Sequence, residues 1–83
     1  MHHRVPLVYD TVDLGEHVRR ARQARGFRQD ELAHRIGVTR MTISRLERGE
    51  SVSVDIALRA LSECGIALAL VPKFSRVTAI DGT

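Results

Sequence analysis

The segment of residues 29–48, QDELAHRIGVTRMTISRLER, constrains the fold of this chain more than any other. Apolar side chains recur in its first half at the spacing of one helical face, and in its second half on the face of another helix. These apolar positions are Leu32, Ala33 and Ile36, then Ile43 and Leu46. Gly37 lies between the two halves, where glycine can end a helix because it enters the left-handed region without steric cost. The segment is therefore predicted to form two short helices joined by a turn.

The turn between these helices carries its own local signals. Thr39 follows Gly37 by two residues, and its hydroxyl can accept hydrogen bonds from the backbone N–H groups that begin the second helix. The small side chain of Ala33 stands where the two helices would press together. Two short helices joined by a glycine-led turn form a helix-turn-helix, which is the structural unit that we predict here.

The same residues resemble the helix-turn-helix of the lambda-repressor-like family, also called the Xre or Cro/C1 type. The resemblance covers about residues 14–65, and its motif positions are Gln29, Glu31-Leu32-Ala33, Gly37-Val38, Ile43-Ser44 and Glu47-Arg48-Gly49. The later stretch SVDIALRALSECGIALALVP resembles the HipB-like antitoxin branch, in which a short strand follows the last helix. The resemblance implies a mainly α fold, a bundle of four to five helices with a short C-terminal β-strand that pairs in a dimer.

Periodic patterns predict one helix before this motif and one after it. Asp13 and Glu16 have the spacing of a capping box, so the first helix is expected to begin at Asp13. Ser53 is expected to cap the last helix, and Gly65 to end it. The apolar faces of these two helices are formed by Leu14, Val18 and Ala21, and by Val54, Leu58 and Leu61.

Six apolar residues, 66–71, follow Gly65 and end at Pro72, a pattern that favours a buried strand over a helix. A lone strand has no ladder partner, so we expect it to pair with the same segment of a second copy across a two-fold axis. Residues 7–9 of the N-terminal arm are the competing candidate for the strand that pairs with this segment. The residues expected in the dimer strand are Ala67, Leu68, Ala69, Leu70 and Val71. The expected organisation is an N-terminal arm at 1–12, a helix-turn-helix domain at 13–65, a dimerisation strand at 66–72 and a tail at 73–83.

Positive charge is concentrated on the helix-turn-helix region. Residues 13–49 hold nine arginines and five acids, a net charge of +4, whereas the rest of the chain has four basic and five acidic residues, a net −1. Such clustering is expected where a protein neutralises nucleic-acid phosphates. The single Cys64 cannot form an intramolecular disulfide, and no secretory signal is visible, so a cytoplasmic protein is expected. The longest apolar run is too short to span a membrane.

Residues 40–48 are the predicted recognition helix, because Ile43 and Leu46 would face the core and the remaining side chains point elsewhere. An α-helix fits the DNA major groove, where arginine can bind guanine through two hydrogen bonds. By resemblance to the family, base contacts are expected from Arg40, Met41, Ser44 and Arg45. Met41 departs from the polar residue often found at its position and can offer only apolar contact. Phosphate contacts are expected on similar grounds from Arg28, Gln29, Thr39 and Arg48.

Two charged residues are predicted to lie against the core. Arg22 follows Val18 by four residues and so leans toward the apolar face of the first helix. Glu47 follows Ile43 by four residues on the core side of the third helix. The family has a matching pair, so we expect an ion pair between Arg22 and Glu47 that ties these two helices together.

These features predict a dimeric, sequence-specific DNA-binding protein that represses transcription at a palindromic operator. The HipB-like resemblance implies an antitoxin that binds a HipA-like kinase toxin and represses its own operon. The residues leave two alternatives open, a free-standing Xre-type regulator without a toxin and a protein-only adaptor that has lost DNA binding. The sequence contains no catalytic set, metal-ligand spacing or phosphate-cradling glycine loop, so we expect no enzyme activity, metal or cofactor.

Overall fold

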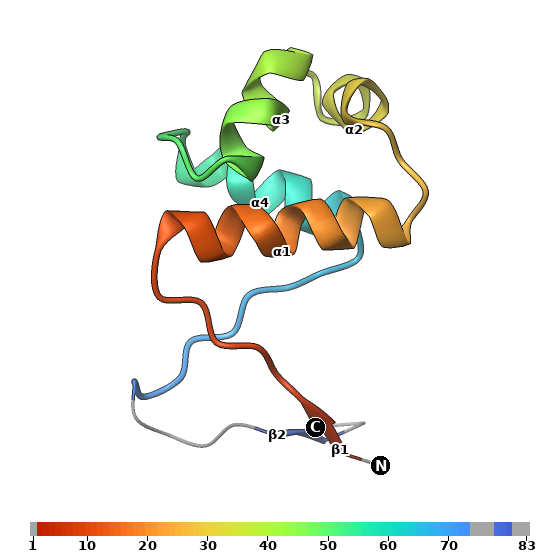
Figure 1. Cartoon of the computed structure of the whole chain (residues 1–83). Coiled ribbons are helices and arrows are strands. Elements are labelled where there is room, and N and C mark those ends of the chain that lie inside the picture. The colour runs from red at the N-terminus through yellow and green to blue at the C-terminus, as the bar shows by residue number, and fades with distance from the viewer. Residues whose placement is uncertain (1, 74–77, 81–83) are drawn as a thin grey trace.

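The computed structural model describes residues 2–73 and 78–80, with side chains described for residues 5–73. In this part of the chain the elements are β1 (His2–Arg4), α1 (Thr11–Ala24), α2 (Gln29–Ile36), α3 (Arg40–Glu47), α4 (Val54–Glu63) and β2 (Thr78–Ile80). α2 and α3 lie above α1 and α4, and both terminal segments extend below the helices (Figure 1). The predicted mainly α, helix-turn-helix fold is confirmed.

The helices close around one small core. Val18 of α1, Leu32 of α2 and Ile43 of α3 are fully buried. α3 packs against both α1 and α2, and α4 packs against α2 and α1. Gly15 permits the close approach of α1 to α3, because a Cβ at this position would lie 2.5 Å from the carbonyl oxygen of Leu46. This packing holds the inner face of α3 against the core and leaves its outer face open to solvent.

α1 begins two residues earlier than the sequence predicts. Asp10 caps the helix, and its Oδ1 accepts a hydrogen bond from the backbone N–H of Asp13 at 2.8 Å. The prediction that Asp13 opens the helix was therefore wrong. Asp10 and Asp13 stand at the same three-residue spacing as Asp13 and Glu16, so the local pattern did not show where the chain turns. Thr39 and Ser53 cap α3 and α4 as predicted.

The strand predicted at residues 66–72 is not observed in the single chain. This segment has no assigned secondary structure, and neither has the competing segment at residues 7–9. Among the described residues, the backbone–backbone hydrogen bond that reaches residues 66–71 is the one from the Ile66 N–H to the Leu61 carbonyl, at 2.9 Å. A strand requires a hydrogen-bonded neighbour, and the described residues of one copy offer this segment none.

The two strands that the structure does contain were not predicted. β1 and β2 pair antiparallel, with His2 opposite Ile80 and Arg4 opposite Thr78. This pairing brings the two ends of the chain together below the helices (Figure 1). Each strand has three residues, too few to show a periodic pattern in the sequence. Apart from Lys73 and β2, the predicted tail lies outside the described residues.

Candidate nucleic-acid interface

α3 has an apolar inner face and a basic outer face. Ile43 and Leu46 are at most 3% exposed and contribute to the core. Arg40, Met41 and Arg45 are exposed on the opposite side of the helix, and Met41 leaves 58% of its surface open to solvent. The structure therefore brings three of the four predicted base-contacting residues onto one accessible helix face, as the helical period requires.

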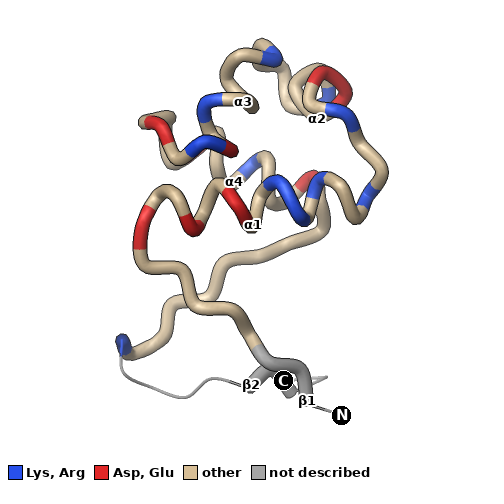
Figure 2. Tube along the Cα trace, in the orientation of Figure 1, with Lys and Arg blue, Asp and Glu red and all other residues tan. Residues whose placement is uncertain are grey.

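The outer face of α3 also carries cations that the protein itself does not neutralise. Neither Arg40 nor Arg45 forms an ion pair with any residue that the structure describes. Most other arginines of the region have a carboxylate partner, namely Arg20, Arg22, Arg28, Arg35 and Arg48. Figure 2 shows basic residues on both α1 and α3. An exposed cation without an internal partner keeps its attraction for phosphates and for the acceptor atoms of bases.

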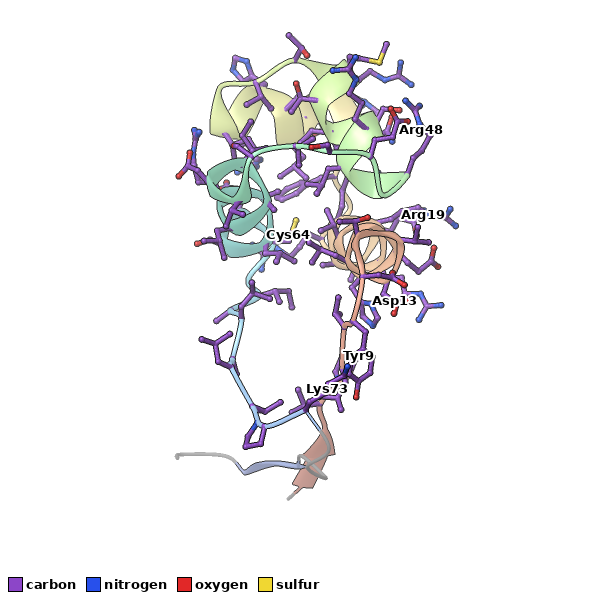
Figure 3. All side chains as sticks on the ribbon, turned by 90° about the vertical axis from the view of Figure 1, so that its left-hand side faces the viewer. Tyr9, Asp13, Arg19, Arg48, Cys64 and Lys73 are labelled. Carbon is purple, nitrogen blue, oxygen red and sulfur yellow. The ribbon has the colours of Figure 1, made fainter. Side chains whose placement is uncertain are left out.

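The remaining predicted residues of α3 contact one another at its C-terminal end. Arg48 donates from Nη1 to the Ser44 hydroxyl at 2.7 Å and from Nε to Glu50 at 2.6 Å. Because both charged side chains of this pair are about half exposed, Arg48 can exchange Glu50 for another anion. Figure 3 shows Arg19 of α1 extending from the same side of the molecule as Arg48. Arg19 has no carboxylate partner in the described part of the chain, and the sequence analysis did not select it.

Arg28 precedes α2 and pairs with the acidic first turn of that helix. Its Nε lies 3.1 Å from Oδ1 of Asp30 and 3.6 Å from Oε1 of Glu31. The hydrogen bond to Asp30 raises the pKa of Arg28, and the same hydrogen bond lowers the pKa of the Asp30 carboxyl. Glu31 also accepts the backbone N–H of Arg28 at 3.0 Å. These acids offset the unfavourable position of a cation at a helix N-terminus.

The predicted ion pair between Arg22 and Glu47 is present and largely buried. Arg22 donates to Glu47 through Nε at 2.6 Å and through Nη2 at 3.0 Å, and the two side chains are 11% and 4% exposed. Arg22 Nη1 also donates to the carbonyl oxygen of Phe27 at 2.8 Å. The hydrogen bonds to Glu47 raise the pKa of Arg22, although burial opposes the shift. One guanidinium group thus joins α1, α3 and the loop that leads to α2.

Gln29 extends this ion pair to the start of α2, which the sequence analysis missed. Its Nε2 donates to Glu47 Oε1 at 3.1 Å across 18 residues of chain. Arg59 of α4 makes a second contact of this kind, because its guanidinium donates to the carbonyl oxygen of Ile36 at the end of α2. Both contacts join residues distant in the sequence, so no local pattern could have identified them. Together they hold the start of α2 against α3 and the end of α2 against α4.

Other kinds of site have little basis in the described residues. No three His, Cys, Asp or Glu side chains gather there as metal ligands. The helices described are too short, or too polar, to cross a membrane. Cys64 is 5% exposed within the core, and burial raises the pKa of its thiol. Its environment is that of a packed core residue rather than of a reactive thiol.

The fold and the basic face of α3 define a DNA-binding transcriptional regulator of the helix-turn-helix class. The family model described as Helix-turn-helix matches residues 18–71, so this chain belongs to that family. A protein of Pyrococcus furiosus that carries the name of an HTH-type transcriptional regulatory protein is 44% identical over 46 residues. The match covers 54% of this chain and only 15% of that protein.

Solved structures of HipB share the fold. In a HipB–O4 20mer complex the similar chain has a TM-score of 0.76 and 24% sequence identity, and the match covers 83% of this chain and 99% of that one. A HipA–HipB–O2–O3 complex gives the same values. A HipB–O1–O2 complex gives a TM-score of 0.74 and 25% identity over 82% of this chain and 100% of that one.

Proposed function

We propose that this protein is a cytoplasmic, homodimeric repressor that binds a palindromic operator and serves as the antitoxin of a HipA-like kinase toxin. The observation that carries the DNA-binding part is the accessible face of α3, where Arg40 and Arg45 lack acidic partners among the described residues. In this proposal α3 enters the major groove and its side chains read the bases. The residues assigned to bases are Arg40, Met41, Ser44 and Arg45.

Phosphate contacts position the recognition helix in this proposal. Gln29 lies in the first turn of α2, where its amide and the backbone N–H groups can bind a phosphate. Thr39 is the N-cap residue of α3, and the side chains of Arg28 and Arg48 are exposed. Arg28 and Arg48 give up their contacts to Asp30 and Glu50 when they bind phosphate, which is feasible because both ion pairs are exposed. We add Arg19 to this group because it extends from the same side as Arg48 (Figure 3).

Dimer formation is proposed through residues 67–71. Leu70 is fully exposed in the single chain, and Leu68 is 53% exposed. Pairing with the same segment of a second copy would cover these leucines and provide the backbone with a ladder. A two-fold dimer would hold two α3 helices about 34–36 Å apart, which suits two half-sites on one face of the duplex.

The antitoxin role is supported by the likeness to HipB, which occurs with HipA in one of the similar structures. A free-standing regulator is the alternative, favoured by the name of the Pyrococcus furiosus relative. Co-expression with the product of the neighbouring reading frame distinguishes the two roles. We expect a stable complex with a kinase-like protein, whereas a chain that purifies alone and still binds DNA would be a free-standing regulator. A protein-only adaptor is disfavoured by the uncompensated arginines of α3.

The DNA-binding proposal is tested by fluorescence anisotropy with DNA from upstream of the protein's own gene. We expect wild-type protein to bind this DNA more tightly than random sequence, with affinity falling steeply as salt rises. Arg40→Ala should remove most of that preference. Arg35→Ala is a matched control, because Arg35 is an exposed arginine that pairs with Glu63 of α4. Equal binding of both DNAs by the wild-type protein would contradict sequence-specific recognition.

A further inference from the structure

Two extended segments below the helices enclose an apolar groove. The arm segment, residues 5–9, leads up to α1, and the exit segment, residues 66–71, leads down from α4 (Figure 1). Figure 3 shows them on opposite sides of an opening, beneath the helices and above Lys73. The space between them, which we call the arm groove, has a volume of about 750 Å³. One water molecule occupies roughly 30 Å³, so the single chain leaves room here for a much larger occupant.

The lining of the arm groove is mostly apolar, and His17, Arg20 and Lys73 are its basic members. Val8 belongs to the arm segment, Leu68 and Leu70 to the exit segment, and Leu14 and Ala21 to the underside of α1. The hydroxyl of Tyr9 donates to the carbonyl oxygen of Lys73 at 3.3 Å, which joins the arm segment to the chain just beyond the exit segment. An apolar groove of this size on the surface of a small chain indicates a surface that another molecule covers.

The backbone of both walls shows what kind of occupant fits. Among the described residues, no backbone–backbone hydrogen bond joins residues 5–8 or 67–71 to any other segment. A groove whose walls are two extended chains with free N–H and C=O groups matches an extended chain inserted between them. Such an occupant must be apolar, because the alternating leucines of the exit segment would lie beside it. A folded helix or a compact polar ligand would leave these backbone groups unpaired.

We infer that the arm groove of each copy holds the exit segment of its partner, so that the arm segment becomes an outer strand of the dimer. This inference rests on the proposed dimer and adds the arm to its interface. The exit segment fits the groove in composition and exposure, with Leu70 fully exposed. Each copy supplies one groove and one occupant, so the contact closes about a two-fold axis and leaves neither groove empty.

The two-fold axis specifies the order of strands in the resulting sheet. In Figure 1 the arm segment rises toward α1 and the exit segment descends from α4, and their traces cross. Two exit segments related by a two-fold axis are antiparallel to each other. The order across the sheet is therefore arm, partner's exit segment, exit segment, partner's arm. Every exit segment then has a neighbour on both edges, and only the arms remain at the edges.

The inference is tested by sedimentation equilibrium of full-length variants, with circular dichroism to verify the helices. Val8→Asp changes the arm wall, and Leu70→Asp changes the exit segment. Val54→Asp is the matched control, since Val54 is 74% exposed on α4 and does not line the groove. We expect each of the first two changes to raise the dimer dissociation constant about tenfold or more, because a charged carboxylate would replace an apolar side chain in the interface and lose its hydration. The control should dimerise like the wild type.

The two variants distinguish the contribution of the arm segment to the dimer from the contribution of the exit segment. If Leu70→Asp dissociates the dimer and Val8→Asp does not, the exit segments pair without the arm, and the inference is wrong while the proposed dimer stands. If neither change weakens the dimer, the interface lies elsewhere and both proposals fail.

A disulfide test does not depend on the folding of a charged variant. Copies with Val8→Cys are mixed with copies that carry cysteine at 68, 69 or 70, and heterodimers are expected for at least one position under mild oxidation. Copies with Val54→Cys in place of Val8→Cys should give none. Absence of any cross-link from Val8→Cys would overturn the inference. The native Cys64 is buried and so interferes little.

Discussion

The helical body and the two segments below it differ in how far one chain can complete them. In the body, residues 11–65, side chains from all four helices bury one another, and every buried side-chain nitrogen or oxygen that the structure describes has a hydrogen-bond partner. In the arm and exit segments, large apolar side chains remain exposed, and no backbone–backbone hydrogen bond joins residues 5–8 or 67–71 to another described segment. The body therefore satisfies its own polar interactions, whereas the lower segments keep apolar side chains and backbone groups available for the proposed partner.

This difference separates two parts of the proposed function. The face of α3 that would read DNA is held by contacts within one copy, through Gly15, Arg22 and Glu47. The spacing of two such faces on DNA would depend on contacts between copies. Full burial of one leucine stabilises a protein by about 1.5–3 kcal/mol, so covering Leu68 and Leu70 in both copies would be a substantial driving force for the proposed dimer.

The largest expected effect is a loss of stability of the helical body. Glu47→Ala and Arg22→Ala should each lower the free energy of unfolding by about 3–5 kcal/mol, because the remaining charge is buried without its partner. Thermal unfolding followed by circular dichroism measures the effect. Arg20→Ala is the matched control, because its ion pair with Glu16 is exposed and contributes at most about 1 kcal/mol. Melting temperatures close to the wild type for both core variants would mean that the ion pair does not tie α1 to α3.

The next largest effect is expected from a truncation that removes the exit segment and the tail and keeps the helical body. A chain that ends at Gly65 should keep its helices but become monomeric, and its operator affinity should fall by about 100-fold or more through lost bivalency. Light scattering and anisotropy measure the two changes. If the truncated chain is still dimeric at micromolar concentration, the interface is on the body, and the fourth helix becomes the leading candidate.

A third effect distinguishes residues that read bases from residues that hold phosphates. Arg45→Ala should reduce binding to the operator by about 1–3 kcal/mol and relax the preference at one base position. Arg28→Ala should weaken binding to all sequences alike and reduce the salt slope by about one unit. Competition binding with operator and random DNA measures both. Equal losses on the two DNAs for Arg45→Ala would remove it from the base-reading set.

The smallest effect concerns the exposed surface of the body. Because Arg28 lowers the pKa of Asp30, an NMR titration should find that carboxyl below its ordinary value of about 3.9. The pair then contributes stability that is fully present above that ordinary value and is lost as the pH falls through the lower, folded-state pKa. Arg28→Ala should return the Asp30 pKa toward its ordinary value. An unchanged titration in the variant would show that the contact between Arg28 and Asp30 does not persist in solution.

Much of the body could be predicted because its signals are local. Thr39 and Ser53 cap the helices that follow them, and Gly37 ends α2 in the left-handed region with φ of 72°. Each of these helix starts and ends depends on atoms within one helical turn. The start of α1 was less predictable, because Asp10 and Asp13 offer the same capping chemistry one turn apart. Only the entry of the chain from the arm segment selects between them.

The sequence by itself determined the apolar faces of α1, α2 and α3, the turns between the helices and the position of the basic residues along α3. The face predicted for α4 was wrong at Val54 and Leu58, which are 74% and 43% exposed, because Ala57 and Ala60 face the core beside Leu61. It also indicated the Arg22–Glu47 ion pair, since helical spacing places both side chains toward the core. The tertiary structure alone decided that Gln29 joins that ion pair, that Arg59 binds the end of α2, and that residues 67–71 form no backbone–backbone hydrogen bond with the rest of the described chain. The physical reason is the separation along the sequence over which each kind of interaction acts. Periodicity and capping act within a few residues, whereas these contacts join groups 18 or more residues apart, and their geometry exists only after the helices have packed.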